Sequence, residues 1–236
     1  MNIGIIGSKG RMGQTLCEIL SKGSNTIIEV DLHNISIVDQ VAKKVDLFIL
    51  AVPFLSAVEY IQKFSENVTC IEVTSIKTPM IPFRGRIISI HPLFGPRSFL
   101  DVELRNIVFI KDISFSGSVD LVKQLFPGFN IIETTASEHD ALVAKVQVAP
   151  YLISILANLI NCDTELKTRS KKVLEKMAGV SNDQNPNVLL DTISRNPFSM
   201  YIIKEIQEKI NEMVSELSDS NSDFRIEHKW DSRKCA

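Results

Sequence analysis

The sequence has little of what marks a metal site, a nucleic-acid-binding surface or a secreted scaffold. Its four cysteines, at positions 17, 70, 162 and 235, form no CxxC pair and no other spacing typical of metal ligands. The formal net charge is −2 with no basic run, so we expect neither nucleic acid nor a membrane surface as a partner. An apolar segment opens the chain without a signal-peptide pattern. These absences predict a cytoplasmic protein with no bound metal.

The 236 residues suffice for two modest domains, and the pattern changes near residue 136. We predict a dinucleotide-binding domain over 1–136, a helical domain over 137–218 and a polar tail over 219–236. The most apolar stretch, 141–160, is interrupted by Lys145, Gln147 and Pro150. A buried helix therefore fits it better than a membrane span.

A glycine-rich loop follows the first predicted strand, 2–6, and precedes a predicted helix over 14–20. In this setting Gly7 would make the tight turn, Gly10 would admit a pyrophosphate, and Gly13 would let the helix pack on the sheet. The spacing is GxxGxxG rather than the common GxGxxG, so a structural turn in another α/β protein stays an alternative. The predicted cofactor-binding residues here are Gly7, Ser8, Lys9, Gly10, Arg11, Met12 and Gly13.

Asp31 ends the second predicted strand, 26–31. A carboxylate there would bind the ribose hydroxyls and repel a 2′-phosphate, which favours NAD over NADP. Lys9 and Arg11 could instead reach a phosphate, so NADP remains possible.

Further strands are predicted over 46–53, 69–73, 86–90, 106–110 and 130–133, with a helix over 118–126. Strands alternating with helices indicate a Rossmann-type, doubly wound, mostly parallel sheet. Two loops hold side chains that could bind or react with a substrate. One contains Ser75 and Lys77, and the other leaves the sheet at His91 and reaches Arg97. A hydroxyl, a lysine, an imidazole and an arginine at one sheet edge could bind an anionic substrate and move a proton.

Over residues 1 to about 160 the sequence resembles the prephenate dehydrogenase family, which makes the precursor of tyrosine. The resemblance is carried by the glycine loop, Val52-Pro53, Ser75-x-Lys77, the segment from His91 to Pro96, and Ser137-Glu138-His139-Asp140. It implies NAD(P)-dependent oxidative decarboxylation of prephenate to 4-hydroxyphenylpyruvate, with Val52 and Pro53 beside the cofactor.

The resemblance also implies roles for three catalytic residues. His91 would take the proton of the substrate hydroxyl, and Ser75 would hydrogen-bond that hydroxyl or His91. His139, on a helix that we expect Ser137 to cap, would lie close to substrate and cofactor; packing against a neighbouring loop is the alternative.

The chain departs from the family at its substrate cation. The family supplies an arginine upstream of an Asn-Pro pair, and Asp191 stands roughly at that place here. Arg195 from a shifted register, Arg97 or Lys77 could bind the carboxylates instead. A second departure is Tyr151, where the family often carries a histidine.

Three other functions stay open: an arogenate dehydrogenase, an imine or nicotinamide reductase, and a sensor that binds a dinucleotide without catalysis. After residue 137 we expect helices over 141–160 (with a kink at Pro150), 167–177, 187–193 and 198–217. The first of these is apolar over much of its circumference, which indicates a homodimer interface and agrees with the family; burial inside a monomer is the alternative.

Overall fold

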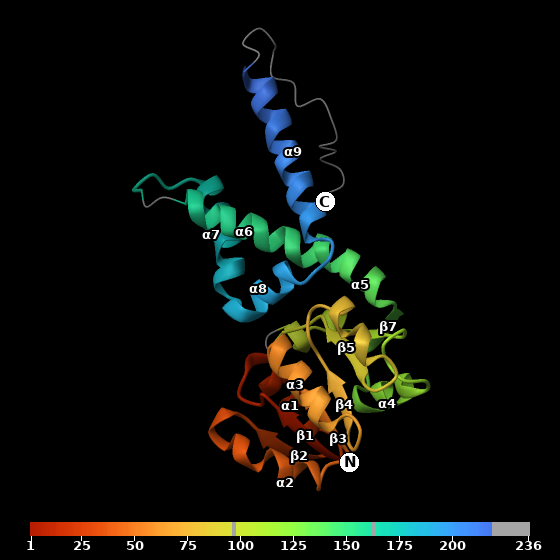
Figure 1. Cartoon of the computed structure of the whole chain (residues 1–236). Helices are drawn as coiled ribbons and strands as arrows, with labels where there is room; N and C mark the ends of the chain where they lie inside the picture. Colours follow the sequence, from red (N-terminus) through yellow and green to blue (C-terminus); the bar gives the residue numbers. More distant parts are fainter. Residues whose placement is uncertain (96–97, 162–163, 219–236) are drawn as a thin grey trace.

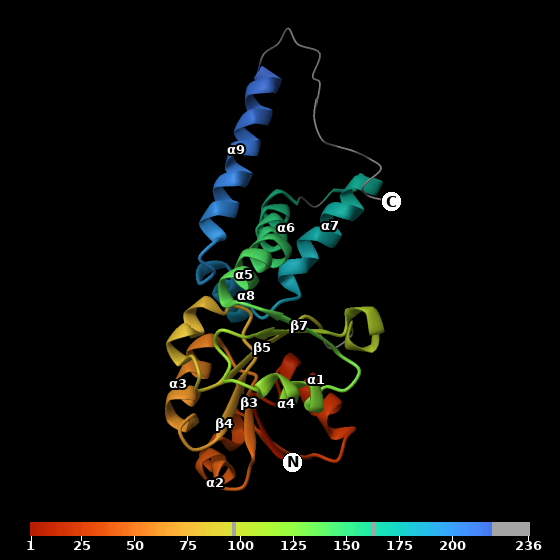
Figure 2. The same ribbon diagram turned by 90° about the vertical axis from the view of Figure 1, so that its right-hand side faces the viewer.

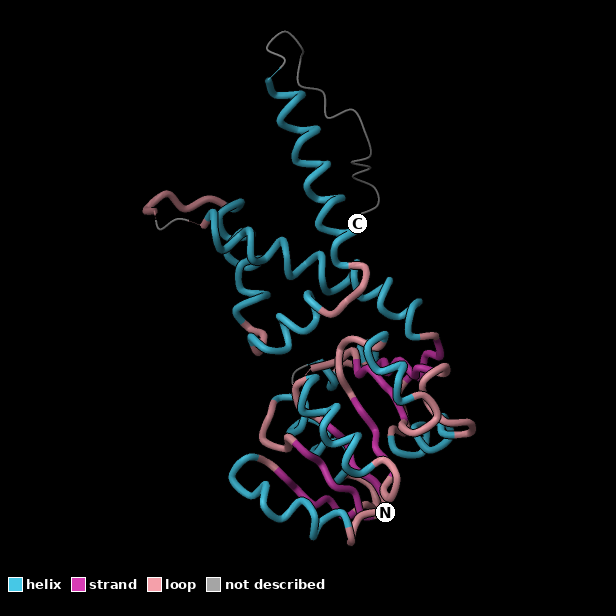
Figure 3. Tube along the Cα trace, in the orientation of Figure 1, coloured by secondary structure: helices cyan, strands magenta, loops and turns pink. Residues whose placement is uncertain are grey.

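The computed structural model describes residues 1–95, 98–161 and 164–218, and the predicted tail lies outside them. An N-terminal α/β domain meets a helical domain at one end, and the last helix projects away from both (Figure 1). Figure 3 shows the division: strands lie in the first domain, and the second is built of helices and their connections. The strands are β1 Asn2–Ile6, β2 Thr26–Val30, β3 Leu47–Leu50, β4 Thr69–Glu72, β5 Ile88–Pro92, β6 Asn106–Ile110 and β7 Asn130–Thr134.

All seven strands belong to one sheet, in the order β2-β1-β3-β4-β5-β6-β7. Every neighbouring pair is parallel except β5 and β6. This confirms the predicted mostly parallel Rossmann-type sheet. The chain winds outward in both directions from β1 and β3, and ligands of such sheets bind in the crevice at the carboxyl ends of these two strands.

Helices cover both faces of the sheet (Figure 2). α1 Arg11–Ser21 and α4 Ser118–Leu125 pack on one face, and α2 Val38–Ala42 and α3 Phe54–Phe64 pack on the other. All four residues of β3 are buried, and successive side chains enter opposite cores. The uninterrupted apolar strands in the sequence follow from this two-sided burial.

The structure corrects the position of His91 relative to its strand. β5 runs from Ile88 to Pro92, so His91 lies inside the strand, opposite Val108 of β6, and does not begin a loop. Pairing of β5 with β4 ends at Ser89. Pro92 therefore removes no hydrogen bond from that ladder, and its missing N–H does not end the strand.

The helical domain begins directly after β7. α5 Ala136–Val143, a π-helical turn Ala144–Val148 and α6 Ala149–Ile160 form one continuous helix. The wide turn lies just before Pro150, which lacks an N–H and whose ring would crowd the preceding turn of a regular helix. α5 is capped by Thr135 with Glu138, so the expectation that Ser137 is the cap was wrong. The remaining helices are α7 Arg169–Asn182, α8 Pro186–Ser194 and α9 Ser199–Ser218.

The apolar helix over 136–160 is not buried inside the chain. In the described part of the chain it is the one helix long and apolar enough to cross a membrane, judged by length and composition only, and 28% of its most apolar window is buried. Its exposed side chains include Leu142, Val146, Leu156 and Leu159. Burial inside a monomer, the alternative to a partner interface, is therefore not what a single chain shows.

Candidate active site

The glycine loop closes tightly on β3. Gly7 has φ +85°, and a Cβ there would overlap the carbonyl oxygen of Ala51. A Cβ on Gly13 would overlap the carbonyl oxygen of Gly7, whereas one on Gly10 would lie 3.3 Å from that oxygen. Gly7 and Gly13 are thus required by the backbone itself, and Gly10 is the position where space remains.

The groups at the start of α1 suit a phosphate. Among the described residues, no side chain caps the first N–H groups of α1. The Ser8 hydroxyl is fully buried and has no hydrogen-bond partner in the described residues. Backbone amides and a hydroxyl without partners at a helix N-terminus fit the oxygens of a pyrophosphate. Met12, half-buried, packs into the core behind them.

Asp31 is held at the end of β2 by the glycine loop. Its Oδ2 accepts from the Lys9 backbone N–H at 2.8 Å, and its Oδ1 accepts from Leu32 N–H at 2.8 Å. Each carboxylate oxygen keeps a further lone pair for a ribose hydroxyl. The Lys9 ammonium lies 2.6 Å from Glu29, so it is engaged and does not point to a phosphate.

Two other predicted cofactor residues border the loop, and Arg11 joins the domains. Val52 follows β3, and its Cγ1 would lie 2.9 Å from a Cβ on Gly7. Pro53 is the N-cap of α3. The guanidinium of Arg11 donates to the carbonyl oxygen of Asp183, at the end of α7.

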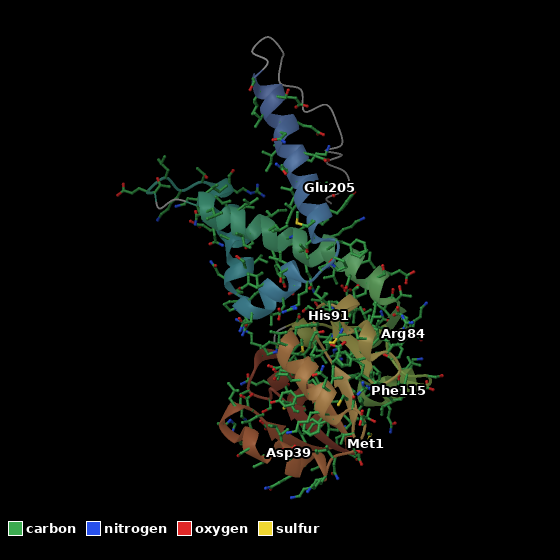
Figure 4. All side chains as sticks on the ribbon, in the orientation of Figure 1. Met1, Asp39, Arg84, His91, Phe115 and Glu205 are labelled. Atoms are coloured by element: carbon green, nitrogen blue, oxygen red, sulfur yellow. The ribbon has the colours of Figure 1, made fainter. Side chains whose placement is uncertain are left out.

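A buried pair of histidines lies where the two domains meet. Nδ1 of His91 is 2.9 Å from Nε2 of His139, and the rings meet edge to face. The side chains are almost sealed from solvent, with exposed fractions of 4% and 2%. Figure 4 labels His91 at the end of the α/β domain that faces the helices, with Met1 at the opposite end. The structure brings these two predicted catalytic residues into direct contact.

Asp140 continues this chain of contacts. Its Oδ1 lies 2.8 Å from Nδ1 of His139 and accepts from Lys77 N–H at 2.9 Å. Its Oδ2 accepts from Thr78 N–H at 2.7 Å. One buried carboxylate thus binds both the histidine pair and the loop that follows β4.

Burial controls the charge of these groups. It lowers the pKa of His91 well below the ordinary value, and the nearby His139 and Lys77 lower it further. Burial also lowers the pKa of His139, although the hydrogen bond to Asp140 acts in the opposite direction. His91 is therefore neutral at neutral pH, as a proton acceptor must be.

Lys77 was expected to bind substrate, and the structure assigns it elsewhere. Its ammonium is fully buried, 2.7 Å from Glu72 Oε1 and 2.7 Å from the carbonyl oxygen of Ile90. Burial lowers its pKa, against the opposing effect of Glu72. Glu72 also accepts from the hydroxyls of Ser89 and Thr74. This network binds the loop after β4 to Ile90 of β5, the residue directly before His91.

Ser75 lies half-buried between these fixed points. Its hydroxyl makes no hydrogen bond to any described residue. It is therefore available to a ligand; of the two expected partners, His91 and the substrate hydroxyl, His91 is not hydrogen-bonded to Ser75 in this structure.

Arg195 lies at the end of α8, against the start of α3. Its Nε donates to Asp191 Oδ1 at 2.7 Å, and its guanidinium stacks 4.4 Å from the centre of the Phe54 ring. The next residue, Asn196, donates from its amide to the carbonyl oxygen of Asp140 at 2.8 Å. Arg195 therefore lies beside the turn of α5 that carries His139 and Asp140. Arg97 lies outside the described residues.

Sequence reasoning missed Glu72 and Asp140. Each has a local signal: Glu72 is an acid at the end of an apolar strand with a lysine five residues later, and Asp140 directly follows a candidate histidine. A buried acid needs a partner, so an acid in an apolar run predicts an ion pair or a hydrogen-bond network.

Fold and site together define a class: a dinucleotide-binding α/β domain, a helical domain, and a histidine pair between them. No family model matches the chain, and no curated protein matches it in sequence. In shape it is similar to solved dehydrogenases.

A prephenate dehydrogenase from A. aeolicus, in complex with hydroxyphenyl propionate and NAD+, has a TM-score of 0.73 at 16% identity, with 93% of this chain and 91% of that chain covered. A putative prephenate dehydrogenase from Corynebacterium glutamicum gives 0.71 at 17% identity, with 92% and 82% covered. A Synechocystis arogenate dehydrogenase gives 0.61 at 16% identity, with 93% of each chain covered. The chain has the fold of these enzymes over nearly its whole length.

Proposed function

We propose that this chain is a prephenate dehydrogenase, which oxidises and decarboxylates prephenate to 4-hydroxyphenylpyruvate with NAD. One observation carries the proposal: two buried, touching histidines, His91 and His139, lie at the end of a dinucleotide fold where the helical domain meets it. The likeness in shape to prephenate and arogenate dehydrogenases supports it.

The cofactor fits the residues of the glycine loop. We infer that Gly7, Gly10, Gly13 and the uncapped start of α1 hold the pyrophosphate, and that Asp31 binds the ribose hydroxyls. The Asp31 carboxylate would repel a 2′-phosphate, which favours NAD over NADP. When bound, the nicotinamide supplies the acceptor for hydride.

The remaining chemistry needs a proton acceptor and a fixed substrate. As hydride leaves the carbon that bears the hydroxyl, Nε2 of His91 accepts the hydroxyl proton, and Ser75 hydrogen-bonds the same hydroxyl. Loss of carbon dioxide then restores an aromatic ring, so the residues of the site have only to hold the substrate in place.

Arg195 is our choice for the substrate cation. Lys77 is buried against Glu72, whereas Arg195 is partly exposed and its two terminal nitrogens make no hydrogen bond to a described residue. The Asp191 carboxylate and the Phe54 ring fix its direction, which suits a planar guanidinium that binds a carboxylate.

We further propose a cytoplasmic homodimer. The helices of the second domain leave apolar side chains uncovered on α6 and α9, and a stable monomer would bury such faces. A second copy presents the same apolar residues and would cover them.

The test is formation of NADH by the purified chain, with prephenate or arogenate as substrate and NAD or NADP as cofactor. The proposal predicts turnover with prephenate and NAD, and a loss of at least about 100-fold in the His91→Asn variant. Turnover with arogenate alone would favour the arogenate dehydrogenase. Binding of NAD without turnover of either substrate would favour the sensor or a different reductase.

A further inference from the structure

We propose that Asp140 is a positioning residue that fixes the tautomers of both histidines, so that the nitrogen of His91 left for a ligand carries no proton. The catalytic consequence rests on the proposed function above, but the tautomers themselves do not.

Asp140, His139 and His91 form a hydrogen-bonded chain, which we call the relay. The positions of its protons follow from Asp140, which lies at one end. An ionised carboxylate only accepts hydrogen bonds. Lys77 N–H and Thr78 N–H donate to its two oxygens. Nδ1 of His139, 2.8 Å from Oδ1, must therefore carry a proton as well, because a lone pair there would face a negative oxygen.

The state of His139 then sets that of His91. In a neutral ring a protonated Nδ1 leaves Nε2 with a lone pair. This Nε2 lies 2.9 Å from Nδ1 of His91, so the proton of that contact belongs to His91. With Nδ1 protonated, Nε2 of neutral His91 is the acceptor. It makes no hydrogen bond to any residue in the described part of the chain.

Both imidazoles and the carboxylate are in the states that this relay needs. Burial alone would raise the pKa of Asp140, but hydrogen bonds from His139, Thr78 and Lys77 outweigh it and hold that pKa below its ordinary value. The charged groups around the pair are Asp140 on α5, the Lys77 ammonium on the loop after β4, and Glu72 on β4. Lys77 and Glu72 neutralise each other, which leaves the Asp140 carboxylate to stabilise positive charge on the imidazoles.

In turnover the proton balance is direct. With a nicotinamide bound to accept hydride, the substrate O–H bond would break and an N–H bond would form at Nε2 of His91. The imidazolium of His91 would then donate its Nδ1–H to His139, which in turn donates to Asp140. When carbon dioxide leaves, its bonding electron pair would enter the ring, and the ring oxygen would take the proton back from Nε2 of His91. In the opposite tautomer, Nε2 of His91 would carry a proton already and could not take another from neutral substrate.

The test is nitrogen NMR of the histidine side chains in the whole chain without substrate. Two of the four histidines, His33 and His228, are removed by the double change His33→Gln and His228→Gln. Both remaining rings should show a protonated Nδ1 and an unprotonated Nε2 at neutral pH. A protonated Nε2 on either ring would overturn the proposal. This readout needs no change at Asp140, so it holds even if that residue is required for folding.

The Asp140→Asn change gives the causal test. An amide has one acceptor where three donors converge, so the NH2 group competes for Nδ1 of His139 and the Nε2–H tautomer of His91 becomes populated. We expect kcat with prephenate to fall by at least about 100-fold, with KM little changed. The matched control is Asp112→Asn, since Asp112 accepts from Ala136 N–H at the start of the same helix but does not touch the relay. A folded Asp140→Asn variant with unchanged tautomers and kcat would contradict the proposal.

The two proposals fail separately. Predicted tautomers without turnover of prephenate would leave the positioning role of Asp140 intact and remove the proposed function. Turnover of prephenate with a protonated Nε2 on His91 would support the proposed function and remove the positioning role of Asp140.

Discussion

Two regions of the molecule differ in which side chains they bury: one buries polar groups, and the other exposes apolar groups. Where the α/β domain meets the helices, polar side chains are buried in one connected network of Glu72, Lys77, His91, His139 and Asp140, with Nε2 of His91 left for a ligand. On the outside of the helical domain, apolar side chains such as Leu156, Leu159 and Leu217 face solvent. A buried polar network with one acceptor left unpaired points to catalysis, and uncovered apolar groups point to a partner. The contrast predicts that changes at the first site affect turnover and that changes at the second affect assembly.

Glycines in the two domains give the largest contrast. Gly13→Ala places a Cβ on the carbonyl oxygen of Gly7, so we expect a loss of stability of about 3 kcal/mol or more and no binding of NAD. Gly179→Ala in α7 meets nothing within 4 Å. It should raise the free energy of unfolding by about 0.5–1 kcal/mol. Urea unfolding and NAD titration measure both, and a folded Gly13→Ala that binds NAD would contradict the packing described here.

The uncovered apolar face gives the next contrast. Ile210→Glu with Met213→Glu puts two charges on the stripe of α9 that is half-exposed in one chain. We expect a monomer with intact secondary structure, measured by light scattering after gel filtration. Lys204→Glu on an exposed part of the same helix is the control and should remain dimeric. A monomeric wild type would remove the dimer proposal.

A change at Arg195 tests whether this residue binds the carboxylates of the substrate. Arg195→Gln removes the charge but keeps hydrogen-bond donors, so KM for prephenate should rise about 10–100-fold, the loss expected for a charge-assisted hydrogen bond. kcat should change little. Arg84→Gln, at an exposed site, is the control. An unchanged KM would assign the substrate carboxylates to another cation.

Asp31 tests the crevice at β1 and β3. Asp31→Ser removes the charge and still accepts a hydrogen bond at the start of the turn that follows β2. The ratio of kcat/KM for NAD to that for NADP should fall about 10-fold or more, because repulsion of a 2′-phosphate is lost. A ratio that does not move would mean that Asp31 does not face the ribose.

The last contrast is the pH dependence of stability. The pKa of His91 and that of His139 lie below 6.5 in the folded chain, so the unfolded chain binds more protons as pH falls through about 6.5. The free energy of unfolding should therefore fall below that pH, by up to about 1.4 kcal/mol per pH unit for each histidine. His91→Asn should reduce the slope by about one proton, and an unchanged slope would show that His91 is not buried neutral.

Local patterns could be recognised in the sequence, and buried pairings could not. The glycine loop, Asp31 and the two histidines stand out in the sequence because short segments create them. Lys77 was assigned to substrate because Glu72, five residues before it at the end of an apolar strand, was not recognised as its buried partner. His91 was placed in a loop because the antiparallel strand β6, which pairs with β5 as far as Pro92, comes from a later segment.

The most direct test is analysis of the products formed from prephenate and NAD, by mass spectrometry together with NADH absorbance. The proposal predicts one 4-hydroxyphenylpyruvate for each NADH, at rates that fall by at least about 100-fold in His91→Asn and remain unchanged in Asp112→Asn. NADH without 4-hydroxyphenylpyruvate, or a His91→Asn variant as active as the wild type, would contradict it.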